Sequence, residues 1–166
     1  MEPPARYSLV HKDVAARTYD VHRLVQAVMR ETMDKDTQRL WAERVVKAVN
    51  LAFPFVDLST WPLCERLLPH AQVCAELITR WGFEIKEAAR LLNQAGYYLH
   101  ERARYTEAEP LYVRSLGISE KVLGPEHPSV AVVLRNMTEN YAQMKREGEA
   151  ERCRQRARSI EQRKDR

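Results

Sequence analysis

The strongest constraint on the fold is an internal repeat with a period of 42 residues. Residues 91–128 contain two amphipathic helical patterns joined by a short turn, and Gly124-Pro125 and Pro128 close the block. When residues 133–162 are laid beneath this block, Glu107-Ala108-Glu109 aligns with Glu149-Ala150-Glu151. The same shift aligns three further identical pairs, which are Leu92 with Leu134, Arg104 with Arg146, and Ile118 with Ile160. A fixed period of this size predicts stacked helix pairs.

The composition agrees with helices and contains no pattern typical of a membrane span. The 166 residues include five Gly and eight Pro, which favours helices joined by proline-marked turns. No apolar run approaches the roughly 20 residues of a membrane helix, and no signal-type segment follows Met1, so we expect a cytoplasmic protein. Cys64, Cys74 and Cys153 are odd in number and lack CxxC spacing, so we interpret them as reduced core side chains.

The net charge of +4 belongs to the C-terminal end of the chain. Residues 1–144 contain 18 basic and 18 acidic residues, whereas residues 145–166 contain 9 basic and 5 acidic residues. We interpret this basic excess as the solvated face of a helix. A surface for phosphates or an acidic partner is the alternative interpretation.

The N-terminal segment, residues 1–36, predicts a small β-hairpin followed by a helix. Polar and apolar residues alternate from Tyr7 onwards, and Thr18–Val21 would form the returning strand. The following helix carries an apolar stripe that consists of Leu24, Val25, Val28 and Met29. Residues 7–33 resemble the end of the winged-helix segment in bacterial signalling ATPases of the STAND (NB-ARC) type, in which a tetratricopeptide array follows. The resemblance implies a part or relic of such a protein without its motor, because no GxxxxGK[ST] loop is present.

A stretched copy of the repeat precedes the central block. A shift of 44 residues aligns Trp61 with Tyr105 and Glu65 with Glu109, and the additional residues fall in the connection at 54–60. The expected apolar face of its first helix consists of Leu40, Trp41, Val45, Ala48, Val49 and Ala52. The repeat region, residues 37–166, is therefore expected to contain three helix pairs, at about 37–81, 85–122 and 127–163.

The central block resembles a tetratricopeptide repeat (TPR) of the kinesin-light-chain type. The residues that carry the resemblance are Leu92, Gly96, Leu99, Tyr105, Ala108, Tyr112, Ser115 and the LGPEHP turn at 123–128. The resemblance implies an all-α superhelical array of antiparallel helix pairs. Gly96 and Ala108 are expected where two helices cross closely. Ala103 occupies the place of a usual turn glycine, so this turn must avoid a positive φ or carry strain.

The resemblance also implies a peptide-binding concave face, built from the first helix of each pair. The predicted peptide-binding residues are Arg90, Asn93, Gln94, Tyr97, His100, Glu101, Arg135, Asn136, Glu139 and Gln143. Asn136 matches the family's recurring groove asparagine, whose amide can both donate to and accept from a peptide backbone. The alternative interpretation is that these are ordinary solvated polar residues.

No residue pattern indicates catalysis, a cofactor or a metal. No two of the five histidines stand at i, i+4, and GxSxG is absent. We therefore expect a non-enzymatic module that binds a partner protein or peptide. A nucleic-acid-associated regulator is one alternative, suggested by the hairpin and the Arg-rich end, although a recognition helix is absent and charge is balanced over residues 1–144. Self-association into a homo-oligomer through exposed apolar edges is another.

Overall fold

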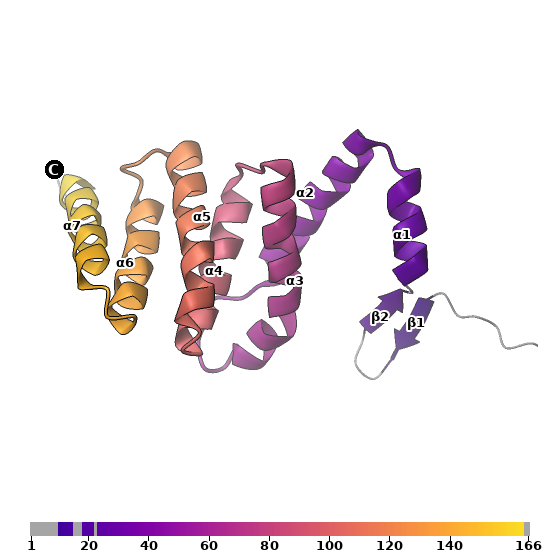
Figure 1. Ribbon diagram of the computed structural model, residues 1–166, viewed down its shortest axis with the longest axis horizontal. Helices are drawn as coiled ribbons and strands as arrows, with labels where there is room; N and C mark the ends of the chain where they lie inside the picture. Colours follow the sequence, from indigo (N-terminus) through magenta and orange to yellow (C-terminus); the bar gives the residue numbers. More distant parts are fainter. Residues whose placement is uncertain (1–9, 15–17, 22, 165–166) are drawn as a thin grey trace, which may run out of the picture. The chain divides into compact units, whose positions relative to one another are not determined.

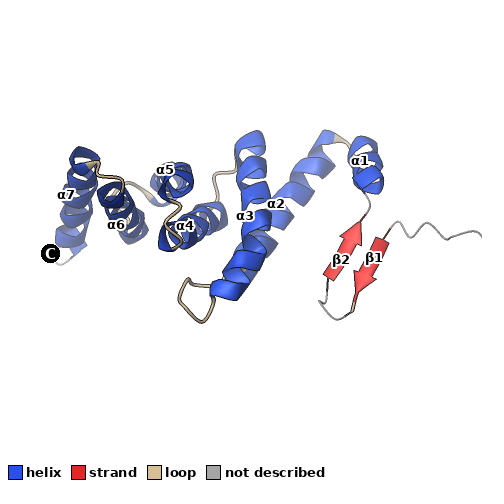
Figure 2. Ribbon diagram, turned by 60° about the horizontal axis from the view of Figure 1, so that its bottom comes forward, coloured by secondary structure: helices blue, strands red, loops and turns tan. Residues whose placement is uncertain are grey.

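The computed structural model describes residues 10–14, 18–21 and 23–164. These residues contain two short strands and seven helices (Figures 1 and 2). The chain divides into two compact units, of which one ends at Trp41 and the other begins at Ala42. The division at residue 36 and the grouping of the helices into three pairs stay predictions.

The first unit contains the two strands and the helix that follows them. Strand β1 (Val10–Asp13) pairs with β2 (Thr18–Val21) in antiparallel register, with Val10 opposite Val21 (Figure 2). Of the residues expected in the hairpin, 7–9 and 15–17 lie outside the described residues. Helix α1 spans Arg23–Thr32, and Val28 and Met29 of its predicted apolar stripe are exposed.

A polar side chain begins helix α2 (Lys35–Ala52). The carboxylate of Asp34 accepts hydrogen bonds from the backbone nitrogen of Thr37 at 2.7 Å and from its hydroxyl at 2.9 Å. These two bonds lower the pKa of Asp34. The carboxylate therefore satisfies a backbone donor that the first turn of a helix leaves without an internal partner.

The second unit continues with five further helices. They are α3 (Trp61–Trp81), α4 (Lys86–Glu101), α5 (Tyr105–Leu123), α6 (Pro128–Gln143) and α7 (Glu147–Lys164). Helix α4 packs against α3 and α5, and α6 packs against α5 and α7, so neighbours in sequence are neighbours in space (Figure 1). No described helix is long and apolar enough to cross a membrane.

The buried face of α2 differs from the predicted one. Val45, Ala48 and Ala52 were expected to be buried but are exposed, whereas Ala42 and Val46 are buried. Both sets have helical spacing, and they differ by a shift of one residue. Because α2 carries apolar side chains on both faces, the hydrophobic period alone could not select the face that meets the core.

The close crossing of α4 and α5 is formed by small residues, as the sequence predicted. The ring of Tyr112 lies against Gly96, where an added Cβ would stand 3.0 Å from Cε1 of the ring. The Ser115 hydroxyl donates to the carbonyl of Ala89 at 2.7 Å, and Ala108 is fully buried. These contacts fix how closely the two helices approach, since interiors at native density leave no room for an additional methyl group.

Three helix ends in this unit share one turn geometry. The residues after α3, α4 and α6 are Gly82, Ala103 and Lys145, and their φ angles are 61°, 57° and 59°. In each turn the next backbone nitrogen donates to a carbonyl five residues earlier, at distances of 2.9–3.1 Å. This is the Schellman arrangement, in which glycine is the usual residue at the left-handed position. Ala103 therefore carries the strain that the sequence left as one of two options.

Candidate functional site

A groove of about 750 Å³ opens between α4 and α6. Its walls are formed by these two helices, its floor includes residues of α5, and the loop after α2 borders it. The residues that line it are Asn50, Phe55, Val56, Lys86, Glu87, Ala89, Arg90, Asn93, Gln94, Tyr97, Ser115, Ser119, Leu123, His127, Ser129, Val132, Val133 and Asn136. The lining thus combines apolar, amide, hydroxyl and charged side chains.

Five of the ten predicted binding residues line this groove, and five do not. Those that line it are Arg90, Asn93, Gln94, Tyr97 and Asn136. The five that do not are His100, Glu101, Arg135, Glu139 and Gln143. All ten stay predictions as binding residues, but their surroundings now differ greatly from one another.

Asn93 and Asn136 form an amide pair that joins α4 to α6. The Nδ2 atom of Asn136 donates to Oδ1 of Asn93 at 3.0 Å, and both side chains are half-buried. The bond uses one donor and one acceptor, so the pair keeps amide hydrogens on Asn93 and carbonyl lone pairs on Asn136. An extended peptide presents the complementary N–H and C=O groups along its backbone.

Arg90 holds the end of α2 rather than pointing freely into the groove. Its Nη1 donates to the carbonyl of Asn50 at 2.8 Å and to Oδ1 of Asn50 at 3.0 Å, and both Nη atoms lie 3.4 Å from the carbonyl of Phe53. The guanidinium also lies 4.9 Å from the ring centroid of Phe55. Arg90 therefore caps carbonyls that a helix end leaves without partners, and it positions one wall of the groove.

Arg135 lies away from the groove, towards α7. Its Nε stands 3.8 Å from Oε1 of Glu161. It lines a second, smaller cavity of about 200 Å³ together with Pro128 and Ile160. Arg135 and its neighbour Asn136 therefore face different surfaces.

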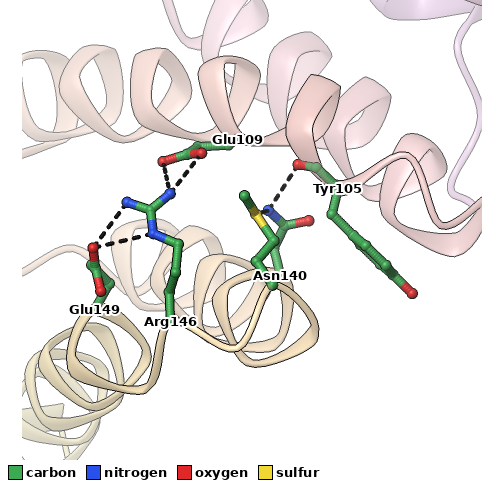
Figure 3. Close-up of polar contacts among 6 residues, drawn as sticks. Tyr105, Glu109, Asn140, Arg146 and Glu149 are labelled. Carbon is green, nitrogen blue, oxygen red and sulfur yellow. Dashed lines mark hydrogen bonds and ion pairs between the residues drawn. The ribbon is translucent and has the colours of Figure 1, made fainter.

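His100 belongs to a joint of three helices that the sequence did not reveal. Its Nδ1 lies 3.2 Å from Oδ1 of the buried Asn140. The Nδ2 of Asn140 in turn donates to the carbonyl of Tyr105 at 3.1 Å, as Figure 3 shows. The His100 ring stacks on Tyr97 and meets Tyr105 edge-on. Asn140 thus connects α4, the start of α5 and α6, and a polar residue within the apolar stripe of α6 was the available signal.

A second joint centres on Arg146 and connects α5 to α7 (Figure 3). Its Nη1 donates to both carboxylate oxygens of Glu109 at 2.8 and 2.9 Å, and its Nε and Nη2 donate to Glu149 at 3.1 and 2.9 Å. The guanidinium also lies 4.6 Å from the centroid of the Tyr141 ring. Two carboxylates and a ring face together restrict the guanidinium in a way that a single surface pair would not.

Three of the six basic side chains on α7 form ion pairs. Arg154 binds Glu151, Arg156 binds Glu120 at 2.5 Å, and Arg163 lies 3.1 Å from Glu126. The positive charge of these arginines is therefore offset locally, which favours the solvated-face interpretation over a surface for phosphates.

The described residues contain no group of three or more side chains that could hold a metal ion. Their cysteines are free, and burial raises the pKa of Cys74 to about 11. The Cys74 thiol is therefore protonated at neutral pH, and it is the thiolate that acts as a nucleophile.

The architecture and the known families agree on the class of fold. The helices from α2 onwards define an α-helical repeat protein. Residues 87–163, which contain α5, α6 and most of α4 and α7, match the model of the tetratricopeptide repeat family. This stretch is therefore similar to tetratricopeptide repeats, and repeats of that family generally mediate protein–protein interactions. A comparison with curated proteins gives no significant match.

Proposed function

We propose that this chain is a non-enzymatic interaction module that binds an extended segment of a partner protein in the groove between α4 and α6. The observation that carries the proposal is the amide pair of Asn93 and Asn136 at the edge of an open, preformed groove. A segment in extended conformation has backbone groups that need hydrogen-bond partners, and the pair offers one donor and one acceptor.

Apolar groups beside the amide pair support the same proposal. Phe55, Leu123 and Val132 line the groove and are partly or largely accessible. Burial of an apolar side chain against them would contribute most of the affinity, while the amides would fix the orientation of the segment. A short segment held by one apolar contact and a few hydrogen bonds has a small contact area, and we expect a Kd of about 1 μM or weaker for it.

We further propose that the module functions in the cytoplasm as part or relic of a STAND-type signalling protein. The support is the resemblance of residues 7–33 to the segment that precedes a tetratricopeptide array in such proteins. A nucleotide-binding module encoded in the same operon or reading frame would agree with this proposal. A genomic context without any such module would contradict it.

The groove proposal is tested by selecting binders from a library of random peptides displayed on phage. The variant Asn93→Ala/Asn136→Ala should raise the Kd of the selected peptides about 30-fold, because two hydrogen bonds of roughly 1 kcal/mol each are lost. Because both amides of the pair are removed together, neither is left without its hydrogen-bond partner. Gln72→Ala is the matched control, since Gln72 is an exposed amide on α3 outside the groove. Equal affinity of the double variant and the control would refute the groove assignment.

A further inference from the structure

Two buried polar side chains of the groove have no hydrogen-bond partner within the described ranges. The part of the chain that the structure describes contains five buried polar side chains. Three of them form hydrogen bonds with backbone carbonyls, and these are Ser115, Thr138 and Asn140. The other two are Gln94, which is 7% exposed, and Ser119, which is 3% exposed, and neither side chain forms a hydrogen bond with any described residue. Both line the groove, and because buried polar groups in proteins are nearly always hydrogen-bonded, their missing partners have to be sought there.

The polar atoms of Gln94 and Ser119 are accessible from the groove. In the described chain, every fully covered polar side-chain atom without a partner belongs to a residue other than these two. The amide of Gln94 and the hydroxyl of Ser119 therefore reach the protein surface, and the surface that both residues border is the groove. In the free protein, water can hydrogen-bond to both groups. A segment that covers them must provide hydrogen-bond partners in place of that water, because a polar group covered without a partner weakens binding.

The two open side chains, Gln94 and Ser119, lie at different levels along the groove. The Ser115 hydroxyl donates to the Ala89 carbonyl at 2.7 Å, which sets these two residues side by side on α5 and α4. Gln94 lies five residues further along α4, and Ser119 lies four residues further along α5. The two helices are antiparallel, because only residues 102–104 join them, so these steps lead in opposite directions. At about 1.5 Å per residue, the two open side chains start roughly 13 Å apart along the groove.

The side chains that fit these two positions are uncharged. A charged side chain would lose its hydration there without a free ion of opposite sign to offset the loss. Among the charged residues that line the groove, Arg90 already binds carbonyls at the end of α2, and Lys86 and Glu87 are neighbours of opposite charge. An apolar side chain would cover the Gln94 amide without replacing its hydrogen bonds to water. Carboxamides and hydroxyls avoid both costs, because each can donate and accept.

We propose that the groove selects partner segments that carry two uncharged polar side chains four positions apart, one bound to Gln94 and the other to Ser119. The side chains concerned are those of glutamine, asparagine, serine and threonine. Residues i and i+4 of an extended chain lie on one face, and a rise of about 3.3 Å per residue separates them by about 13 Å, which matches the spacing of the two positions. The inference rests on the proposed function, because the same groove holds the segment.

The test reads the sequences of random peptides selected on phage against the full chain. Uncharged polar residues should be enriched over the unselected library at two positions four apart. In a selected peptide, replacing either residue by methionine or by glutamate should raise the Kd about tenfold, because a covered group of the groove loses its hydrogen-bond partner. These changes are made in the peptide, so they leave the fold of the protein untouched.

Variants of the protein then assign each enriched position to its residue. Selection against Gln94→Met should lose the enrichment at one position, and selection against Ser119→Ala should lose it at the other. Gln72→Met, which changes an exposed amide on α3 outside the groove, should keep both. Far-UV circular dichroism checks that each variant keeps its helices.

The outcomes separate this inference from the proposed function. Peptides that Asn93→Ala/Asn136→Ala weakens but that lack the two polar positions would overturn the inference and leave the groove assignment standing. Enrichment that persists in both Gln94→Met and Ser119→Ala would overturn it as well, because other residues would then recognise the polar side chains. A library that yields no binder would overturn both proposals.

Discussion

The turn after α4 provides a direct measure of backbone strain, because the protein contains a matched glycine turn. Ala103 and Gly82 have nearly the same φ, 57° and 61°, and the same hydrogen-bond pattern. A left-handed conformation costs a residue with a Cβ about 1–2 kcal/mol. Glycine avoids that cost, but its unfolded chain is more flexible, so the entropy lost on folding costs about 0.4–1 kcal/mol more than it does for alanine. Ala103→Gly should therefore stabilise the protein by roughly 0.5–1 kcal/mol.

Urea unfolding followed by far-UV circular dichroism measures this gain as a higher midpoint at an unchanged slope. The melting temperature should rise by about 3 °C for a chain of this size. Lys145→Gly should produce a similar gain, and the two should add because the turns share no hydrogen-bond partner. Gly82→Ala is the reciprocal control and should destabilise. A loss of stability in Ala103→Gly would show that the turn is not strained.

Two further changes test the packing and the charge network. Gly96→Ala should destabilise the protein by about 1 kcal/mol in thermal unfolding, because the clash with the buried Tyr112 ring outweighs the gain in helix propensity. An increase in stability would contradict the close crossing of α4 and α5. Hydrogen bonds from Arg146 lower the pKa of Glu149 below its ordinary value of 4.5. The charged carboxylate therefore stabilises the protein at pH values above 4.5, and this contribution is lost as the pH falls through the lowered pKa. Glu149→Gln should flatten the loss of stability in acid, and an unchanged pH profile would refute the contribution.

The sequence predicted the helical repeat architecture well, because two aligned copies of the repeat indicate the same arrangement of helices. The 42-residue shift that aligned Glu107 with Glu149 also places these residues in the same turn of α5 and α7. Gly96 could be assigned to the crossing because only a small residue fits under a large ring. The prediction of the buried face of α2 was wrong for the opposite reason. Both faces of this helix are apolar, and no aligned repeat residue distinguished them.

The candidate site was predicted only in part, because long side chains reach beyond the face on which they start. The resemblance to the family placed Arg90 and Arg135 on the concave face, but contacts with Asn50 and Glu161 decide where their guanidinium groups lie. Those partners are distant in sequence or lie on another helix, and no local pattern indicates them. Asn140 was missed because an isolated asparagine in an apolar stripe does not reveal which carbonyl it will meet.

The bond between Arg146 and Glu109 has a consequence for how such an array can grow by duplication. It joins Arg146, the counterpart of Arg104, to Glu109 of the preceding copy, so an added copy would bring its own arginine to Glu151, the counterpart of Glu109. Glu151 already accepts hydrogen bonds from Arg154 and from Gln155, both on its own helix. In an engineered array with one more repeat, the added copy should therefore pack more tightly when Arg154 and Gln155 are first replaced by the residues at their counterpart positions, 112 and 113.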